Sequence, residues 1–254
     1  MSQRAKSVLQ SVDVIVGYTT YIDLIEPLLK EKRVISTGMK KEVDRVGAAI
    51  RSALSGKKTA LISSGDPGIY AMAGLAFEMC HKNDIRISGR STPAEEEILE
   101  PVLKIEVVPG IPALCSGAAL LGAPLTHDFA AISLSDLLTP WESIAKRLEA
   151  AARADFVIVL YNPKSKKRSW QLTEAQKIIL ASRSAQTPVG IVSRAMREGE
   201  TVQIVPLANL HTAPVDMLST VFIGNSTTFN YLDHLITPRG YTDKYDLDQK
   251  GETG

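Results

Sequence analysis

The stretch "SSGDPGIY" at residues 63–70 says more about this chain than any other part of the sequence. It follows a short apolar run, "TALI", which predicts a strand over 59–63, and it precedes the apolar stretch "AMAGLAFEMC". In an open parallel sheet, ligands gather outside the carboxyl ends of the strands. Gly65 allows a ligand to approach the backbone closely, and Pro67 suits the first turn of a helix. The stretch therefore predicts a ligand-binding loop between a strand and a helix.

Asp66, in the middle of this loop, narrows the kind of ligand. A helix N-terminus alone would suit a phosphate, but a fixed carboxylate repels a phosphate at short range. The carboxylate suits hydroxyls, an amino group or a cation instead. The chain also lacks the glycine-rich motifs of the common dinucleotide and triphosphate loops. A ribose-bearing, cationic ligand is favoured, and on the chemistry alone a plain helix cap at Asp66 stays open.

Strands and helices alternate along the chain on both sides of this loop. Short β-branched runs predict strands, and amphipathic stretches such as 42–56 predict helices. This alternation implies a largely parallel sheet covered by helices, so the fold class is α/β. The predicted strands are 12–18, 33–36, 59–63 and 104–108, then 129–134, 155–161, 188–193, 201–205 and 219–224, with further helices near 141–152 and 173–184.

The pattern predicts two lobes. Residues 1–125 form an N-terminal lobe with a mainly parallel sheet, and residues 126–238 form a C-terminal lobe with a mixed sheet. The mixed sheet is expected because only the short "RAMREGE" separates two strands of the second lobe, as in an antiparallel hairpin. Residues 239–254 are predicted to be a polar tail, and the acidic segment 88–101 a surface insertion.

Composition excludes several classes of function. The net charge is +1, so no overall field attracts nucleic acid or an anionic membrane, and no apolar run is long enough to span a membrane. Aromatic residues make up 6% of the chain, which argues against a nucleic-acid binder built on the basic run at 164–168. Cys80 and Cys115 lack metal-ligand spacing, so we expect buried, reduced thiols in a cytoplasmic protein and no metal site.

Three further strand ends combine turn residues with small or basic side chains: "VVPGIPA" (107–113), "LYNPKSKKR" (160–168) and "SRAMREGE" (193–200). With "GYTTYIDLI" (17–25) and the Gly-Asp-Pro loop, they make the chain resemble the tetrapyrrole (corrin/porphyrin) methylases of cobalamin synthesis. The loop marks only the superfamily. The segment "HDFAAISLSDLLTPWE" (127–142) together with "YNPKSKKR" (161–168) is specific to the branch of C17-methyltransferases, which act on precorrin-3B or cobalt-factor III. The resemblance runs from about residue 4 to about residue 235.

The resemblance implies a two-lobed fold, distinct from the Rossmann-type methyltransferases, with S-adenosylmethionine held in the cleft between the lobes and S-adenosylhomocysteine as the product. It also implies a cytoplasmic homodimer. Pro112 stands where the family usually has Ser or Thr, which suits a contact through the backbone carbonyl and not one through a hydroxyl. From the matching motifs, the cofactor contacts are expected at Ser64, Gly65, Asp66, Ile69, Pro112, Ala113, Asn162 and Ala195.

The implied reaction is displacement of a methyl group from the sulfonium onto C17 of the tetrapyrrole, which needs mainly proximity and alignment. The C17 branch is also associated with contraction of the macrocycle, a step that needs proton transfer at oxygen. His127 beside Asp128 is the candidate acid–base residue, while a structural role for His127 stays open. The substrate has acetate and propionate groups, which Lys166, Arg168 and Arg194 are expected to bind. The wider set of local cations contains Lys164, Lys167 and Arg197, and for the lysine run at 164–167 a solvated loop is the alternative.

Two questions stay open at the level of sequence. A superfamily member that methylates another corrin carbon, or a protein as in diphthamide synthesis, would share the Gly-Asp-Pro motif. The motifs also do not separate the metal-free substrate from the cobalt-bearing one.

The start of the chain is a separate matter. Family members begin with a strand and a Gly-x-Gly-Pro-Gly loop, whereas "MSQRAKSVLQSVD" (1–13) matches the helix that follows them. That first strand is missing from the match, and its loss from the sheet would leave backbone groups unpaired. We expect the physiological chain to begin upstream of Met1, or this chain to be less stable and less active.

Overall fold

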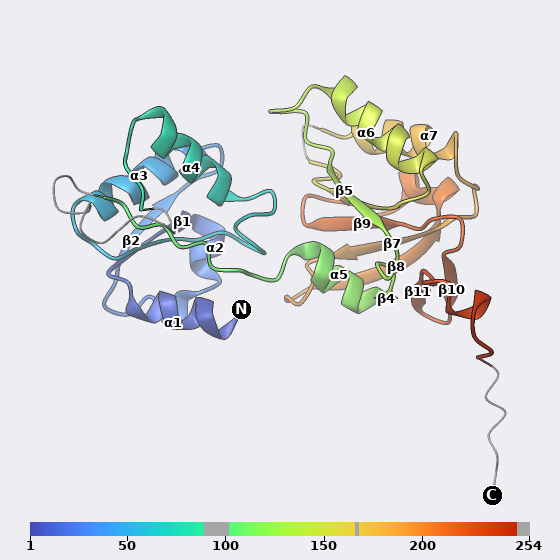
Figure 1. Ribbon diagram of the computed structural model, residues 1–254, viewed down its shortest axis with the longest axis horizontal. Helices are drawn as coiled ribbons and strands as arrows, with labels where there is room; N and C mark the ends of the chain where they lie inside the picture. Colours follow the sequence, from blue (N-terminus) through green and yellow to red (C-terminus); the bar gives the residue numbers. More distant parts are fainter. Residues whose placement is uncertain (89–101, 166–167, 248–254) are drawn as a thin grey trace, which may run out of the picture. The chain divides into compact units, whose positions relative to one another are not determined.

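The structure, a computed structural model, describes residues 1–88, 102–165 and 168–247. It divides into two compact units, Met1–Pro112 and Ala113–Gly254 (Figure 1). The acidic segment expected as an insertion lies almost entirely outside the described residues, as does the end of the expected tail. The described part of the chain contains no helix that is both long and apolar enough to cross a membrane.

The border between the units lies thirteen residues before the expected one at 125/126, because helix α5 (Ala113–Leu121) belongs to the second unit. Its Gly117 packs against Phe222 so closely that a Cβ there would lie 2.7 Å from the ring. Strand–helix alternation groups this helix with the segment before it. Close packing against a distant strand groups it with the second unit instead.

The first unit contains a three-stranded parallel sheet in the order β2-β1-β3. The strands are β1 (Val14–Tyr18), β2 (Arg33–Thr37) and β3 (Thr59–Leu61). Because successive side chains of a strand point to opposite faces, Ile15 packs with α1 and α2, while Val14 and Val16 face α3. Figure 1 shows α1 on one side of the sheet and α3 and α4 on the other. The helices are α1 (Gln3–Ser11), α2 (Thr19–Asp23), η1 (Glu26–Leu28), α3 (Glu42–Leu54) and α4 (Met72–Lys82).

The strand predicted at 104–108 is wrong. Among the described residues, the segment pairs with the rest of the unit only through a bridge just before it, between Leu103 and Ile87. Glu106 instead forms an exposed ion pair with Arg4 of α1 at 2.7 Å. The β-branched residues of the segment 104–108 fit a strand. A strand also needs a neighbouring strand with free backbone groups, and the local sequence does not supply one.

The second unit is built on a five-stranded mixed sheet in the order β5-β6-β9-β7-β8. Strands β5 and β6 are parallel, and β9 is antiparallel to both β6 and β7. The predicted hairpin of β7 and β8 is confirmed, with Ser193 opposite Thr201. The strands are β5 (Phe129–Ser133), β6 (Val157–Tyr161), β7 (Pro188–Ser193), β8 (Thr201–Pro206) and β9 (Ser219–Ile223).

Helices cover both faces of this sheet. Ile158 and Leu160 point to α6 (Trp141–Arg153) and α7 (Trp170–Leu180), and Val159 points to α5 on the other face (Figure 1). Helix α7 corresponds to the helix expected at 173–184, and it begins and ends a few residues earlier than predicted. A small sheet of β10 (Phe229–Tyr231), β11 (His234–Ile236) and β4 (Gly122–Ala123) was not predicted, nor were the 3-10 helices η3 (Leu207–Thr212) and η4 (Tyr241–Asp243).

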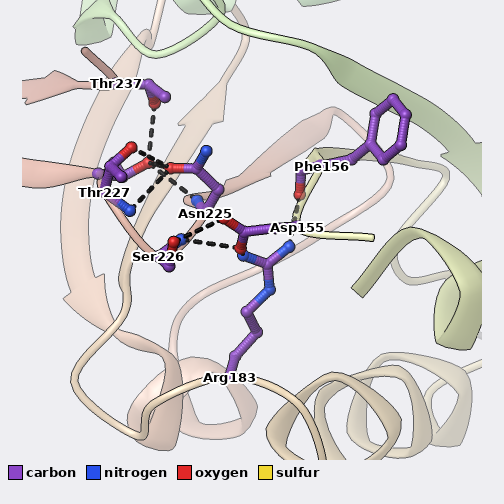
Figure 2. A network of polar contacts seen from close by, with 8 residues as sticks. Asp155, Phe156, Arg183, Asn225, Ser226, Thr227 and Thr237 are labelled. Carbon is purple, nitrogen blue, oxygen red and sulfur yellow. Dashed lines mark hydrogen bonds and ion pairs between the residues drawn. The ribbon is translucent and has the colours of Figure 1, made fainter. Parts of the chain in front are cut away.

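A polar network joins three chain segments at the edge of the large sheet where β6 begins (Figure 2). Asp155 accepts an ion-pair hydrogen bond from Arg183, and its other oxygen accepts the Ser226 hydroxyl at 2.6 Å. Arg183 also donates to the Phe156 carbonyl at 2.8 Å. Next to Ser226, the buried Asn225 side chain closes the turn after β9. The start of β6, the end of β9 and the segment after α7 are held together in this way.

The two cysteines differ in environment. Cys80 is buried in the core of the first unit, and burial raises the pKa of its thiol because the thiolate is poorly solvated there. Cys115 is exposed on α5, so the expectation of a second buried thiol is wrong. It lies on the side of α5 that does not pack against the sheet.

Candidate active site

The Gly-Asp-Pro loop begins directly after β3, at the carboxyl edge of the parallel sheet. Asp66 is half-buried and receives two backbone hydrogen bonds: Gly68 N–H donates to Oδ1 at 2.8 Å and Gly110 N–H donates to Oδ2 at 2.9 Å. One carboxylate therefore fixes its own loop and the "VVPGIPA" segment. A carboxylate has about four lone-pair sites, so Asp66 retains capacity for further donors.

The two loops meet at their glycines. A Cβ on Gly110 would overlap the carbonyl oxygen of Gly65, and Gly65 itself has φ +73°. Only a residue without a side chain fits at Gly110, and the φ of Gly65 is one that L side chains rarely adopt. The result is a patch of bare backbone beside a carboxylate, which suits a ligand that must lie close to the main chain.

Two details of the loop differ from expectation. Helix α4 begins at Met72, so Pro67 is not in its first turn. Its N-cap residue is Ala71, and no side chain makes a capping hydrogen bond there. Asp66 is therefore not a helix cap. Its neighbours complete the turn: the Ile69 N–H donates to the Asp66 carbonyl at 3.2 Å, and Ser64 is half-buried next to Gly65.

In the second unit, the carboxyl ends of β5 and β6 lie side by side. The Ser133 hydroxyl at the end of β5 accepts a hydrogen bond from the Asn162 side chain at 3.0 Å, and Asn162 has φ +50°. The Arg168 guanidinium donates to the Asn162 carbonyl at 2.9 Å, and its buried Nε has no partner among the residues that the structure describes. The expected residues Asn162 and Arg168 are thus brought together at one edge of the sheet.

Ala113 begins α5 near the same edge. The Leu114 N–H donates to the Tyr161 hydroxyl at 2.9 Å, so the start of α5 lies at the end of β6. Pro112 is the last residue of the first unit and is bonded to Ala113 across the border between the units.

The turn from β7 to β8 supplies the remaining expected residues. Arg194 and Met196 have φ +52° and +58°, on either side of Ala195, and such values are uncommon for residues with a side chain. The Arg194 guanidinium lies 3.5 Å from the Asp216 carboxylate. Because β7 runs in the same direction as β6, this turn is at the same edge of the sheet as Asn162. A shallow pocket there is lined by Ser193, Arg194, Thr201, Gln203, Val215 and Asp216.

His127 lies elsewhere. It precedes β5, at the amino end of that strand, so the length of the sheet separates it from Asn162, Arg168 and Arg194. It lines a different pocket, together with Asp155, Asn225, Arg239 and other residues near the network of Figure 2. Its Nδ1 accepts the Asp128 N–H at 2.8 Å, whereas the Asp128 carboxylate is 3.9 Å away. The structure does not bring His127 together with the other expected site residues of its unit.

The remaining predicted cations divide between described and undescribed residues. Lys164 is half-buried and Arg197 is exposed in the β7–β8 turn. Lys166 and Lys167 lie outside the described residues. Within the described ranges, no group of three or more His, Cys, Asp and Glu side chains could hold a metal ion.

Sequence reasoning missed three participants: Ser133, the Tyr161 hydroxyl and Asp216. Ser133 lies near the end of a predicted strand, so it had a local signal, as had Gly110 in the "VVPGIPA" segment. Tyr161 and Asp216 had none, because their roles depend on partners 47 and 22 residues away in the sequence.

The two α/β units, with polar and glycine-containing loops at the carboxyl edges of their sheets, have the architecture expected of a two-lobed methyltransferase. A family model, Tetrapyrrole (Corrin/Porphyrin) Methylases, matches residues 1–211, and the chain belongs to this family. S-adenosylmethionine, the methyl donor expected from the sequence, is the cofactor of the family. The expected family, fold class and enzyme class are confirmed.

Individual relatives are more specific. The chain is 46% identical to the "Probable cobalt-factor III C(17)-methyltransferase" of Salmonella typhimurium, over 95% of this chain and 94% of that protein. It is 49% identical to the "Cobalt-factor III methyltransferase" of Priestia megaterium, over 98% of this chain but only 44% of that longer protein. Among solved structures, the methyltransferase CobJ superposes with a TM-score of 0.80 at 32% identity, covering 94% of this chain and 93% of CobJ.

Proposed function

We propose that this chain transfers a methyl group from S-adenosylmethionine to C17 of a tetrapyrrole in cobalamin biosynthesis, coupled to contraction of the macrocycle. The observation that carries the proposal is the 46% identity to a C17-methyltransferase over nearly the full length of both chains. Both of the relatives described above are named for cobalt-factor III, which favours the cobalt-bearing substrate over metal-free precorrin-3B. Cobalt would arrive as part of the substrate.

The residues at the carboxyl edge of the first unit fit the cofactor. When bound, S-adenosylmethionine supplies an electrophilic methyl group on a sulfonium. Asp66 has lone pairs left over for ribose hydroxyls, and the exposed backbone at Gly65, which packs on Gly110, allows a flat nucleoside to lie against the main chain. Ser64 and Ile69 border this backbone. A negative side chain here favours a cationic nucleoside and disfavours phosphates.

The edge of the second unit provides the other predicted cofactor contacts, Ala113, Asn162 and Ala195. Asn162 and Ala195 both lie in loops that contain positive-φ residues, which turn backbone groups outward from the sheet. Such strained positions persist when the surrounding structure holds them and are enriched at ligand sites. Pro112, next to Ala113, has a carbonyl but no N–H to offer a ligand.

Arg168 and Arg194 are proposed to bind the carboxylates of the substrate, with Lys166 as a further candidate. Arg168 is anchored through one nitrogen to the Asn162 carbonyl, which holds its guanidinium, a group suited to carboxylates, at this edge of the sheet. Arg194 faces Asp216 at 3.5 Å, a distance at which a substrate carboxylate can compete. The assignment of His127 as the acid–base residue stays a prediction, and the proposed methyl transfer does not use it, because His127 lies at the amino end of β5 whereas Arg168 and Arg194 lie at the carboxyl edge of the sheet. A cytoplasmic homodimer is part of the proposal.

Anaerobic incubation with S-adenosylmethionine labelled by a CD₃ methyl group tests the function. Cobalt-factor III and precorrin-3B are supplied in separate reactions, and mass spectrometry follows the tetrapyrrole. We expect one CD₃ group in the cobalt-bearing product, a loss of ultraviolet–visible features of the uncontracted ring, and slower product formation with Asp66→Ala when S-adenosylmethionine is limiting. Labelling of another corrin carbon, or of a protein only, would contradict the proposal. Sedimentation velocity of the purified chain tests the homodimer.

A further inference from the structure

The loop between β5 and α6, residues 134–140, exposes two leucines side by side. The Leu137 side chain is 75% exposed and that of Leu138 is 93% exposed, the highest value among the large apolar residues described. Neither belongs to a hydrophobic cluster of its unit. Single exposed leucines are ordinary, but an adjacent pair at the ligand edge of a sheet calls for an apolar partner.

The stem of this loop is held firmly. The Leu134 side chain is fully buried, and its N–H donates to the Tyr161 carbonyl at 2.9 Å. The Asp136 carboxylate accepts a hydrogen bond of 2.9 Å from the side chain of Gln171, a residue that is only 2% exposed. The loop therefore presents Leu137 and Leu138 at a defined place instead of burying them.

The neighbouring loop, which follows β6, is joined to the first one. The rings of Trp141 and Trp170 meet edge to face with centroids 4.8 Å apart, and Ser133 and Asn162 are hydrogen-bonded across the two strand ends. Arg168 lies in this second loop. Leu137, Leu138 and Arg168 thus lie in two adjacent loops, joined by these contacts, at one edge of the sheet.

We propose that Leu137 and Leu138 contact the face of the tetrapyrrole macrocycle while Arg168 pairs with a carboxylate at its rim. The inference rests on the proposed function and names two further substrate-binding residues. A tetrapyrrole combines a broad, mostly apolar ring with acidic substituents around it, which matches an apolar pair beside a cation. The pair contributes to substrate binding and to placing the ring, and has no part in cofactor binding.

The test replaces both leucines by asparagine, Leu137→Asn with Leu138→Asn, in the full chain. The matched control is Leu232→Asn, because Leu232 is 74% exposed in the β10–β11 turn and its φ of +53° is one that asparagine tolerates. Binding of the tetrapyrrole without cofactor is followed by quenching of Trp141 and Trp170 fluorescence. S-adenosylmethionine binding is measured by calorimetry, and KM and kcat by initial rates.

We expect the double variant to raise the Kd and the KM of the tetrapyrrole about tenfold or more, since two apolar side chains lose their contact. The Kd of S-adenosylmethionine should stay within about twofold of the wild type, and the Leu232→Asn control should leave every quantity unchanged. If the tetrapyrrole quenches the wild type and binds the double variant with the same affinity, the inference about the leucines is overturned and the proposed function stands. An absence of quenching with the wild type would overturn the proposed function. A lower molecular mass of the double variant in sedimentation, with normal tetrapyrrole affinity, would assign the leucines to contact with a second copy of the chain and overturn the inference.

Discussion

Asp66 combines two tasks in a single side chain. Its two oxygens hold the N–H groups of Gly68 and Gly110, so the carboxylate shapes the site before any ligand arrives. In the proposed function, the same negative charge selects against phosphates and for a sulfonium nucleoside. Replacing Asp66 should therefore affect both the stability of the first unit and its affinity for the cofactor, and a control must separate the two effects.

Asp13 offers that control. Its carboxylate accepts the Lys58 N–H at 2.9 Å, just before β1 and so at the opposite edge of the same sheet. We expect Asp66→Ala and Asp13→Ala each to lower the free energy of unfolding by about 1 kcal/mol, because backbone donors lose a charged acceptor. Only Asp66→Ala should weaken S-adenosylmethionine binding, by about tenfold or more. Urea unfolding and calorimetry measure the two quantities. Equal cofactor affinity in both variants would remove Asp66 from the binding site.

His127 provides a second prediction at this scale. Since it lies at the amino end of β5 and accepts the Asp128 N–H, we expect His127→Ala to change kcat by less than about twofold while lowering stability slightly. The measurement is the rate of formation of the contracted product, with circular dichroism as a check of folding. Methylation without contraction in a folded His127→Ala variant would restore His127 as the acid–base residue.

Among the elements, the start of β6, the end of β9 and the segment after α7 depend on one ion pair, between Asp155 and Arg183. The Arg183 side chain is 2% exposed and that of Asp155 is 44% exposed. Burial lowers the pKa of Arg183, but an arginine stays charged at any pH the protein would meet. The pair is therefore asymmetric: one charge is buried and the other remains in contact with water.

This asymmetry predicts which of two variants loses more unfolding free energy. Asp155→Ala leaves a buried guanidinium without a counter-charge and also frees the Ser226 N–H and hydroxyl, so it should cost about 2–4 kcal/mol of unfolding free energy. Arg183→Met leaves a carboxylate that water can solvate, and it should cost about 1–2 kcal/mol. Urea unfolding followed by tryptophan fluorescence gives both values. If Arg183→Met were the more damaging change, the network would depend on packing of the arginine stem and not on charge.

At the scale of the whole molecule, the two units have separate hydrophobic cores. The clusters around Ile15 and Val46 lie in the first unit, and those around Leu160 and Phe222 lie in the second. Each unit is long enough to bury a core of its own. Both tryptophans of the chain, Trp141 and Trp170, are in the second unit, so their fluorescence reports on that unit alone.

We therefore expect the units to unfold at different urea concentrations. Tryptophan fluorescence follows the second unit, and hydrogen exchange of the Val14–Tyr18 strand, read by mass spectrometry, follows the first. A saturating concentration of S-adenosylmethionine should raise the midpoint of the unit that holds the Asp66 loop, because a ligand stabilises the state that binds it. Coincident transitions by both probes, with and without cofactor, would mean that the two units unfold as one.

The sequence by itself determined the fold class, most of the strands and the family. Alternation of apolar runs with amphipathic stretches is a local property, and it was sufficient for β1, β2, β3 and the five strands of the large sheet. The Gly-Asp-Pro motif was equally local, because the conformational freedom of Gly65 and the negative charge of Asp66 do not depend on distant residues. Residues at strand ends, such as Asn162, Arg168 and Arg194, could be placed at one edge for the same reason.

Only the tertiary structure decided which segments pair and which residues meet. The segment 104–108 has the composition of a strand but joins no strand ladder among the residues that the structure describes, and α5 follows the first unit in sequence but packs on Phe222 of the second. His127 lies just before Phe129, the first residue of β5. Because β5 runs parallel to β6, the length of a strand separates His127 from Asn162, which follows the carboxyl end of β6. Pairing, packing and the direction of a strand depend on partners far away along the chain, and the free energy that fixes them is gained only when those partners come together.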